Sequence, residues 1–375
     1  MKDKLRIVKA KIRANITNSK GWKTNRKLLV IESDDWGSIR IPSKQVYNKF
    51  VKQGYSIENT VYNRFDSLAS EEDLNFLFET LDNFKDIHGN PLKITANTIV
   101  ANPDFNKIQK EKFQHYYFEP FTDTLSKYPA HSRSFDIWKD AIEKKMFKPQ
   151  FHGREHLNII LWMAALQSDN KAVHDTFKDC TTYSGKSDYS FMEAFDNKES
   201  ELCIHEQVIK EGLDLFETIF GYRSKSFIAP CYVWHSKLNK VLAEKGISYF
   251  QGTRKQLEPT EEHFKYNLIS HYIGEENEFN QFYLVRNTYF EPSSVKRMDW
   301  VNYALAQINT AFSWGKPAII ASHRVNFVGV LDKKNRDDNL ILLKELIKKV
   351  QKKWPEVEFL SSDELGDIIK ESKNE

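Results

Sequence analysis

The stretch LLVIES at residues 28–33, followed at once by Asp34 and Asp35, sets the pattern for the whole sequence. It is a short, nearly continuous apolar run that ends in polar residues, without the strict alternation of a half-exposed strand. Such runs are typical of strands that are covered on both faces, as in parallel sheets. Seven more runs of this kind lie at residues 93–100, 148–152, 226–231, 247–252, 281–288, 317–322 and 357–361.

Helical patterns separate many of these runs. Residues 70–85 begin at Ser70 with apolar residues at helical spacing, and residues 203–220 repeat the pattern and stop at Gly221, a good C-terminal cap. Further helices are expected at 337–351 and at 361–371, where Ser361 and Glu364 form a capping box. Strand followed by helix, repeated seven or eight times, predicts a parallel α/β protein, and this length favours a barrel over an open doubly wound sheet, which stays an alternative.

Two spacers are too long to be plain connections. Residues 103–147 and 159–225 exceed the usual loop length several-fold, so we expect helical insertions over one face of the barrel. The second contains the polar stretch 179–200, which is a candidate lid. The expected organisation is one elaborated barrel domain over residues 1–375, with these two insertions.

Composition excludes several classes of protein. The 55 Lys and Arg residues nearly balance 52 Asp and Glu, and a net charge of +3 does not indicate a nucleic-acid partner. The first twenty residues lack the apolar segment of a secretory signal, and no run of 18 apolar residues occurs, so we expect a cytoplasmic protein without a membrane partner. Three widely spaced cysteines without a CxxC pair leave histidine and carboxylate as ligands for any metal.

Three groups of polar residues stand at the ends of predicted strands. Asp34 and Asp35 follow the first run, and their repulsion is tolerable if a cation neutralises one of them. His152 and His156 are four residues apart, so on one helical turn their rings would face one metal ion. His323 ends a late strand, which a barrel brings beside the first. Each group alone suits a capped turn or a structural histidine, but together they predict an active site.

These motifs carry a resemblance to a known family. Residues 32–35 (ESDD) resemble the TFDD motif of the polysaccharide deacetylases at both acidic positions, and 152–156 (HGREH) match the spacing of their H-[S/T]-x-x-H motif. Residues 321–323 (ASH) resemble the leucine-x-histidine motif in the histidine, and 359–365 resemble the final strand and helix. The NodB-type domain of that family is a distorted (β/α)7 barrel, which the resemblance implies for residues 27–371 outside the insertions.

The resemblance also implies a mechanism. Asp35, His152 and His156 would bind one divalent metal ion, with Zn²⁺ favoured. Asp34 would take a proton from the attacking water, and His323 would protonate the leaving group. The expected reaction is the removal of acetyl groups from an acetylated carbohydrate substrate.

One motif departs from the family. The R-x-P-Y motif falls on residues 228–231 (IAPC), which keep the proline and lose the arginine and tyrosine. Arg254, Arg286 or Arg324 are candidates to replace the arginine, and Tyr232 to replace the tyrosine. We expect a divergent member whose substrate is not copied from chitin or peptidoglycan enzymes. As substrate-binding residues we expect Trp36, Tyr232, Trp234 and Arg324.

Three alternatives stay open. Two histidines and one carboxylate also form the iron site of non-haem oxygenases, but those usually lie among alternating strands rather than a strand–helix series. A barrel that binds carbohydrate without turnover would fit the loss of the R-x-P-Y residues. The same fold also suits a metal-dependent hydrolase of small non-sugar amides such as cyclic ureides.

Overall fold

All eight apolar runs form strands, and these strands pair in parallel in one curved sheet of a computed structural model that describes residues 11–168, 170–185, 190–294 and 298–374. The strands are β1 (Leu28–Trp36), β2 (Ile94–Ile99), β5 (Phe147–Gly153), β6 (Ser226–Phe227), β7 (Tyr249–Gly252), β10 (Phe282–Val285), β12 (Ala318–His323) and β13 (Glu358–Leu360). A short strand, β11 (Thr288–Tyr289), was not predicted.

The order of strands describes a distorted barrel. It runs β10-β7-β6-β5-β2-β1-β12-β11, with β13 beside the start of β1. No pairing joins β10 to β11 within the described ranges, so the barrel is incompletely closed. The predicted distorted (β/α)7-type barrel is confirmed.

Strand β1 lies in the interior of the sheet, where it pairs with β2, β12 and β13, and all nine of its residues are buried. Leu29 and Ile31 belong to one hydrophobic cluster, whereas Leu28 and Val30 belong to another. Successive side chains of a strand point to opposite faces, so both faces of β1 are covered, as its continuous apolarity predicted.

The predicted helices also form. They are α4 (Glu71–Asp82), α10 (Leu202–Phe220), α13 (Lys333–Lys353) and α14 (Ser362–Asn374). Ser70 and Asp73 make a capping box at α4, and Gly221 ends α10 with a φ of 74°. The Ser361 N–H donates to Glu364 Oε2 at 2.8 Å before α14, which supplies one half of the expected capping box. Two further helices of ten or more residues are α7 (Ser134–Glu143) and α12 (Trp300–Ser313). The short helix α11 (Asn239–Glu244) follows β6.

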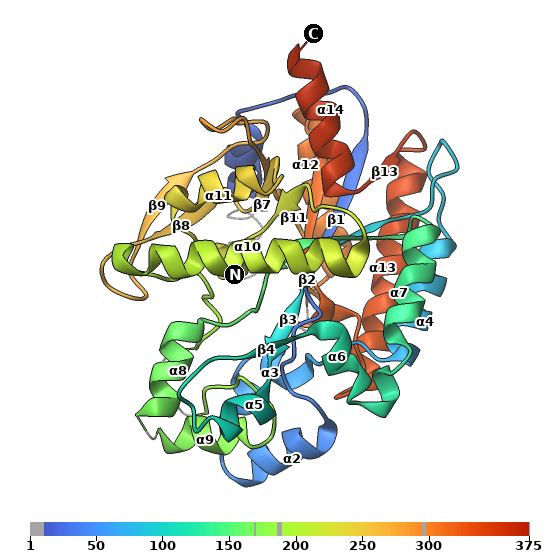
Figure 1. Cartoon of the computed structure of the whole chain (residues 1–375). Coiled ribbons are helices and arrows are strands. Elements are labelled where there is room, and N and C mark those ends of the chain that lie inside the picture. The colour runs from blue at the N-terminus through green and yellow to red at the C-terminus, as the bar shows by residue number, and fades with distance from the viewer. Residues whose placement is uncertain (1–10, 169, 186–189, 295–297, 375) are drawn as a thin grey trace.

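Short elements gather at the carboxyl edge of the sheet. The segment after β1 contains α2 (Lys44–Lys52) and α3 (Val61–Phe65). The segment after β2 contains β3 (Ala101–Pro103), α5 (Phe105–Lys110), β4 (Phe118–Pro120) and α6 (Phe121–Ser126), and the segment after β5 contains α8 (Ile159–Gln167) and α9 (Lys171–Phe177). Helices α2, α3, α5, α8 and α9 cluster at the lower end of the molecule in Figure 1. This end is where barrel enzymes place their catalytic groups.

The remaining connections include a hairpin of β8 (Lys255–Pro259) and β9 (Tyr266–Ser270) between β7 and β10. Of the candidate lid at 179–200, residues 186–189 lie outside the described residues. In the described part of the chain, no helix combines the length and apolarity needed to cross a membrane.

Candidate metal centre and active site

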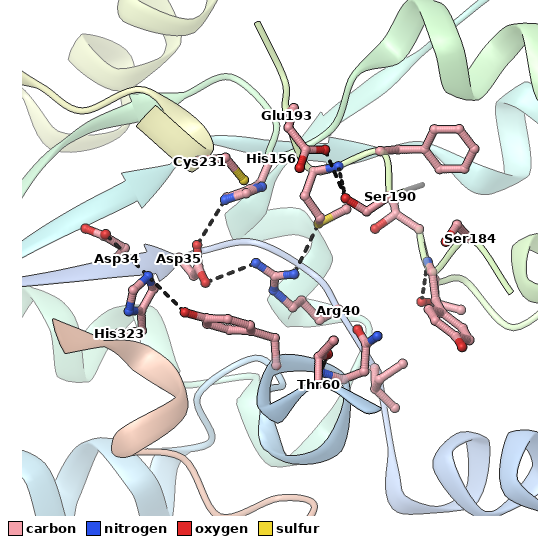
Figure 2. Close-up of a pocket in the computed structure, with 18 of the residues that line it drawn as sticks. Asp34, Asp35, Arg40, Thr60, His156, Ser184, Ser190, Glu193, Cys231 and His323 are labelled. Atoms are coloured by element: carbon pink, nitrogen blue, oxygen red, sulfur yellow. Dashed lines mark hydrogen bonds and ion pairs between the residues drawn. The ribbon is translucent and has the colours of Figure 1, made fainter. Parts of the chain in front are cut away.

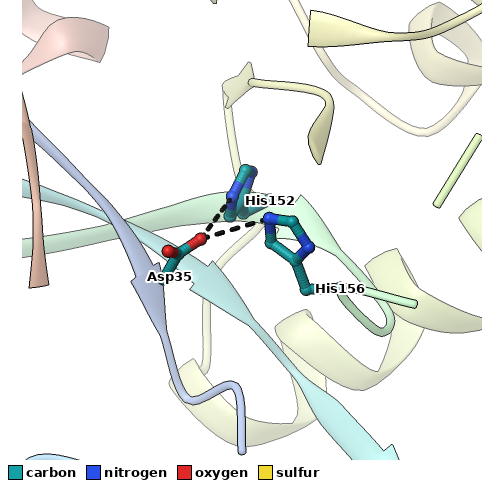
Figure 3. A group of neighbouring side chains, drawn as sticks. All are labelled: Asp35, His152 and His156. Carbon is teal, nitrogen blue, oxygen red and sulfur yellow. Dashed lines mark ion pairs between the residues drawn. The ribbon is translucent and has the colours of Figure 1, made fainter. Parts of the chain in front are cut away.

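Asp35, His152 and His156 converge on one point at the carboxyl edge of the sheet (Figure 3). Asp35 Oδ1 lies 3.5 Å from His152 Nε2 and 3.2 Å from His156 Nε2. A tetrahedral ion with bonds of about 2.0–2.1 Å separates its ligands by about 3.3 Å. The three side chains therefore already have the spacing that a divalent ion such as zinc requires.

The protonation of these side chains also suits a metal ion. His152 donates from Nδ1 to the Ile228 carbonyl oxygen at 2.8 Å, which leaves Nε2 as the bare nitrogen. Nε2 is buried and has no hydrogen-bond partner among the described residues. Burial lowers the pKa of His156 to about 4, so this ring is neutral at pH 7. Burial alone would raise the pKa of Asp35, but Arg40 and His156 hold it well below its usual range.

The local backbone differs from the expectation in one respect. His152 and His156 do not share a helical turn, because His152 lies on β5 and His156 lies in the loop that follows. Gly153 directs the chain into this loop with a φ of 126°, where a Cβ would come within 3.2 Å of the Glu155 carbonyl oxygen. A glycine is needed in this conformation, which accounts for the departure from the Ser or Thr of the family motif.

Asp34 is held by three hydrogen bonds. Arg286 binds both of its carboxylate oxygens, at 2.7 and 2.6 Å, and Asn97 Nδ2 donates to Oδ1 at 2.6 Å. Burial raises the pKa of Asp34, but the Arg286 charge and hydrogen bonds outweigh burial and lower it below the ordinary value. Arg286 also donates to Glu32 Oε2 at 2.5 Å. Of the three candidate arginines, Arg286, which follows β10, is thus the one that binds Asp34.

His323 lies beside Asp34, because β12 pairs with β1 in the register that matches these two residues. His323 Nε2 is 3.6 Å from Asp34 Oδ2 and 3.3 Å from the Tyr62 hydroxyl. Its Nδ1 contacts Glu291 Oε1 at 2.5 Å. Burial lowers the pKa of His323, but Glu291 and Asp34 more than offset burial and raise it to about 9. At neutral pH the ring is therefore protonated, as a general acid must be.

A chain of ion pairs extends from Asp35 into the core. Arg40 Nη2 lies 3.0 Å from Asp35 Oδ2, and Arg40 Nε lies 3.1 Å from Asp66. Asp66 in turn binds both Nε and Nη2 of Arg324, which is fully buried and also donates to the Ser38 carbonyl oxygen. The prediction that Arg324 binds substrate is therefore wrong, because its guanidinium is buried and already bound by Asp66 and the Ser38 carbonyl oxygen.

A cavity of about 400 Å³ lies over these residues (Figure 2). Tyr232, predicted to bind substrate, lines this cavity, and its hydroxyl accepts from Arg286 at 3.1 Å. The two predicted tryptophans do not line it. Trp36 is 1% exposed and packs edge-on against Phe147, and Trp234 is 3% exposed and stacks on a core phenylalanine. Both rings complete the hydrophobic core and are not free to meet a sugar.

Strained backbone surrounds the cavity. Asp35, Cys231 and Tyr232 all have positive φ angles, of 73°, 56° and 60°. Such conformations cost on the order of 1–3 kcal/mol per residue and collect at functional sites. The turn at 231–232 directs both of its side chains toward the cavity.

Sequence reasoning missed Glu291, Tyr62 and Arg40. Glu291 follows β11 closely, and Arg286 follows β10, so both carry the same strand-end signal that pointed to Asp34 and His323. Tyr62 and Arg40 come from the segment after β1, where no pattern distinguishes them from solvent-facing residues. Only the folding of that segment over the sheet edge reveals them.

No protein-family model matches the sequence, and no curated protein is similar to it. Similar solved structures include a protein assigned as a polysaccharide deacetylase from Mycobacterium smegmatis, with 10% identity, a TM-score of 0.48 and 94% of each chain covered. PuuE allantoinase has 10% identity and a TM-score of 0.46, covering 94% of this chain and 92% of that one. The Xyl-CE4 domain of a multidomain xylanase from the hindgut metagenome of Trinervitermes trinervoides has 10% identity and a TM-score of 0.38, covering 93% and 92%. This likeness extends to the fold alone, and the chemistry of the chain rests on its own site.

Proposed function

We propose that the protein is a metal-dependent hydrolase that removes acetyl groups from N- or O-acetylated carbohydrate. The observation that carries this proposal is the arrangement of five side chains in one cavity. Asp35, His152 and His156 have the spacing to hold one metal ion, and Asp34 and His323 flank them side by side on paired strands. An ionised carboxylate beside a protonated imidazole is the pair that hydrolysis of an amide or ester needs.

The residues divide the reaction between them. A divalent ion, for which we propose zinc, supplies a Lewis acid that polarises the acyl oxygen and activates water. Asp34, ionised at neutral pH, accepts the proton of the attacking water as its oxygen bonds to the acyl carbon. His323 donates its Nε2 proton to the leaving nitrogen or oxygen as that bond breaks. Acetate and a free amine or hydroxyl are the products.

Two neighbouring residues act through Asp34 and His323. Arg286 fixes both oxygens of Asp34 and keeps the carboxylate ionised, and Glu291 fixes His323 from Nδ1 and keeps the ring protonated. We propose both as positioning residues. The charged forms needed for catalysis are thereby set before substrate arrives, which is the preorganisation that lowers a barrier in a buried site.

The test combines metal analysis with acetate release. His152→Ala and His156→Ala should lose bound zinc and activity, whereas His115→Ala, which changes an exposed histidine outside the site, should keep both. Asp34→Asn should keep zinc and lose acetate release from a panel of acetylated sugars. Full zinc occupancy in both His152→Ala and His156→Ala would rule out the site. Zinc binding with no turnover of any acetylated compound would indicate a binding protein.

A second candidate function is hydrolysis of small non-sugar amides. The volume of the cavity, about 400 Å³, favours it, because compact amides and cyclic ureides fit such a volume as readily as a sugar does. The same panel, extended with these compounds, separates the two functions. Faster turnover of a ureide than of any acetylated sugar would select the second.

A further inference from the structure

We infer that this site accepts one acetylated sugar unit, free or at the end of a short chain, rather than the interior of a polymer. We further infer that Glu193 recognises the hydroxyl groups of that unit. Both inferences rest on the proposed deacetylation. They come from the depth of the site, the walls around it and the chemistry of those walls.

The reacting groups lie deep. The side chains of Asp35, His152 and His156 are only 3%, 3% and 5% exposed. A polymer that binds by its interior needs a groove that is open on both sides of the reacting atoms. Here these atoms lie at the base of a cavity of about 400 Å³, near the lower end of the roughly 300–1,000 Å³ of pockets that enclose a small molecule. This volume suits one or two sugar rings.

Two segments wall the cavity. Thr60, Tyr62 and Asn63, at the start of α3, supply one wall. Residues 181–184 and 190–193 of the second insertion supply another. In Figure 2, Ser184 and Ser190 lie across the cavity from Asp34 and His323. These two segments border the cavity on sides where a longer chain would pass them.

The wall formed by the insertion is tied to the barrel. Asn158, in the loop after the metal ligands, donates its backbone N–H to the Phe191 carbonyl oxygen at 2.6 Å and its side-chain amide to the Glu193 carbonyl oxygen at 3.3 Å. Arg40 Nη1 contacts Met192 Sδ at 3.1 Å, while its Nη2 holds Asp35. The wall is thus connected to the same residues that position the metal site, and we treat it as part of that site.

The chemistry of the walls suits a polyhydroxylated ligand. Thr60, Thr182, Ser184 and Ser190 offer hydroxyl groups that both donate and accept hydrogen bonds. Glu193 is the carboxylate of this wall. Its Oε2 accepts from Ser190 at 2.9 Å, and no ion pair to Glu193 occurs in the described parts of the chain. Its carboxylate therefore retains acceptor capacity for the hydroxyl donors of a sugar.

A chain-length series tests the size of the substrate. Acetylated chito- and xylo-oligosaccharides of one to six units, the corresponding polymers and 4-nitrophenyl acetate are each given to the zinc-loaded wild-type protein. We expect the highest kcat/KM with one or two units, no increase from three to six, and at most one acetyl group lost per hexamer by mass spectrometry. A kcat/KM that rises with each added unit, or loss of several internal acetyl groups, would overturn the inference.

Activity on the nitrophenyl ester distinguishes a failure of the size inference from a failure of the proposed function. Zinc-dependent hydrolysis of the ester, with sugar turnover only on long chains, contradicts the size inference and leaves the proposed hydrolase intact. Hydrolysis of the ester with no sugar turned over contradicts the sugar-unit inference. Inactivity toward the ester and every sugar contradicts the proposed function together with the inference that rests on it.

Glu193→Gln tests the recognition of hydroxyl groups. We expect KM for the preferred sugar to rise roughly 10-fold or more with little change in kcat, because charge-assisted hydrogen bonds to the ligand are weakened. The nitrophenyl ester has no hydroxyl groups for Glu193 to bind, so kcat/KM for the ester should fall much less than kcat/KM for the sugar. Glu199→Gln, which changes a 62% exposed residue outside the cavity, is the matched control. Equal losses on sugar and ester would assign Glu193 a structural role instead.

Discussion

At the scale of single residues, the contact between Glu291 and His323 sets the pH range of the proposed reaction. The general acid is the protonated ring, and a pKa near 9 keeps it in that form until alkaline pH. Activity on an amide should therefore be lost as pH rises through about 9. Glu291→Gln removes the strongest influence that raises this pKa, so the alkaline limb of kcat/KM should move to lower pH.

A pH profile on an N-acetyl sugar measures this shift, and a nitrophenyl ester is the comparison. The nitrophenolate leaves without a proton, so the variant should lose much less activity on the ester than on the sugar. An alkaline limb at the same pH in wild type and Glu291→Gln would show that Glu291 does not tune His323.

Arg286 compensates two buried carboxylates, Asp34 and Glu32. Its side chain is 0% exposed, and theirs are 5% and 0% exposed. Arg286→Met removes the guanidinium charge from both, although Asn97 still donates to Asp34 and Ser362 still donates to Glu32. Breaking a buried ion pair in this way typically costs about 3–5 kcal/mol. We expect that loss in the free energy of unfolding at pH 7, measured by urea denaturation.

The sign of the pH dependence provides the check on Arg286. The lowered pKa of Asp34 means that Arg286 stabilises the folded protein above the unfolded pKa of this carboxyl, and that this stability is lost as pH falls. The difference between wild type and Arg286→Met should therefore narrow in acid. A difference independent of pH would point to lost packing rather than lost charge. Arg286→Lys, which keeps the charge and loses the two-point contact, should fall between the two.

At the scale of elements, the end of β5 joins a strand to the loop that carries His156. Gly153 makes this junction in a conformation that other residues rarely adopt. Gly153→Ser should destabilise the fold by about 1–3 kcal/mol and weaken zinc binding, because the strained loop displaces His156 from Asp35. Isothermal titration with zinc measures the second effect.

Gly89→Ser is the matched control for this junction. Gly89 also has a positive φ, of 79°, but a Cβ there would meet no atom within 4 Å. Gly89→Ser should therefore lower the free energy of unfolding and leave the affinity for zinc unchanged. Equal zinc affinity in Gly153→Ser and wild type would show that the loop tolerates a side chain at this junction.

At the scale of the whole molecule, zinc would connect β1 to β5, which are separated by β2 in the sheet. A ligand that binds only the folded state stabilises it by about 2.7 kcal/mol at 100 times its Kd. We expect the Tm of the wild-type protein to rise with added zinc and to fall in a chelator. His152→Ala should show neither change, and an equal zinc response in that variant would place the ion elsewhere.

Much of the fold was predictable because strands buried on both faces leave a local signal. Continuous apolar runs gave all eight predicted strands, and Ser70 and Gly221 marked helix ends through hydrogen bonds and backbone angles that involve only nearby residues. Strand-end polar residues likewise pointed to Asp34, Asp35, His152, His156 and His323. These inferences needed only the rule that parallel strands end at one edge of a sheet.

The sequence by itself therefore determined the strand–helix series and pointed to five polar residues at its carboxyl edge, but not to Arg40, Tyr62 or Glu291. Tertiary structure alone decided which of them meet. Arg286 rather than Arg324 binds Asp34. Arg286 follows β10, and its side chain reaches the end of β1, whereas the guanidinium of Arg324 is bound by Asp66. A tryptophan suits a sugar-binding groove as well as a hydrophobic core, so the sequence could not place Trp36 and Trp234. In the folded chain both are packed in the core. Contacts between distant segments depend on how the chain closes, which no local pattern encodes.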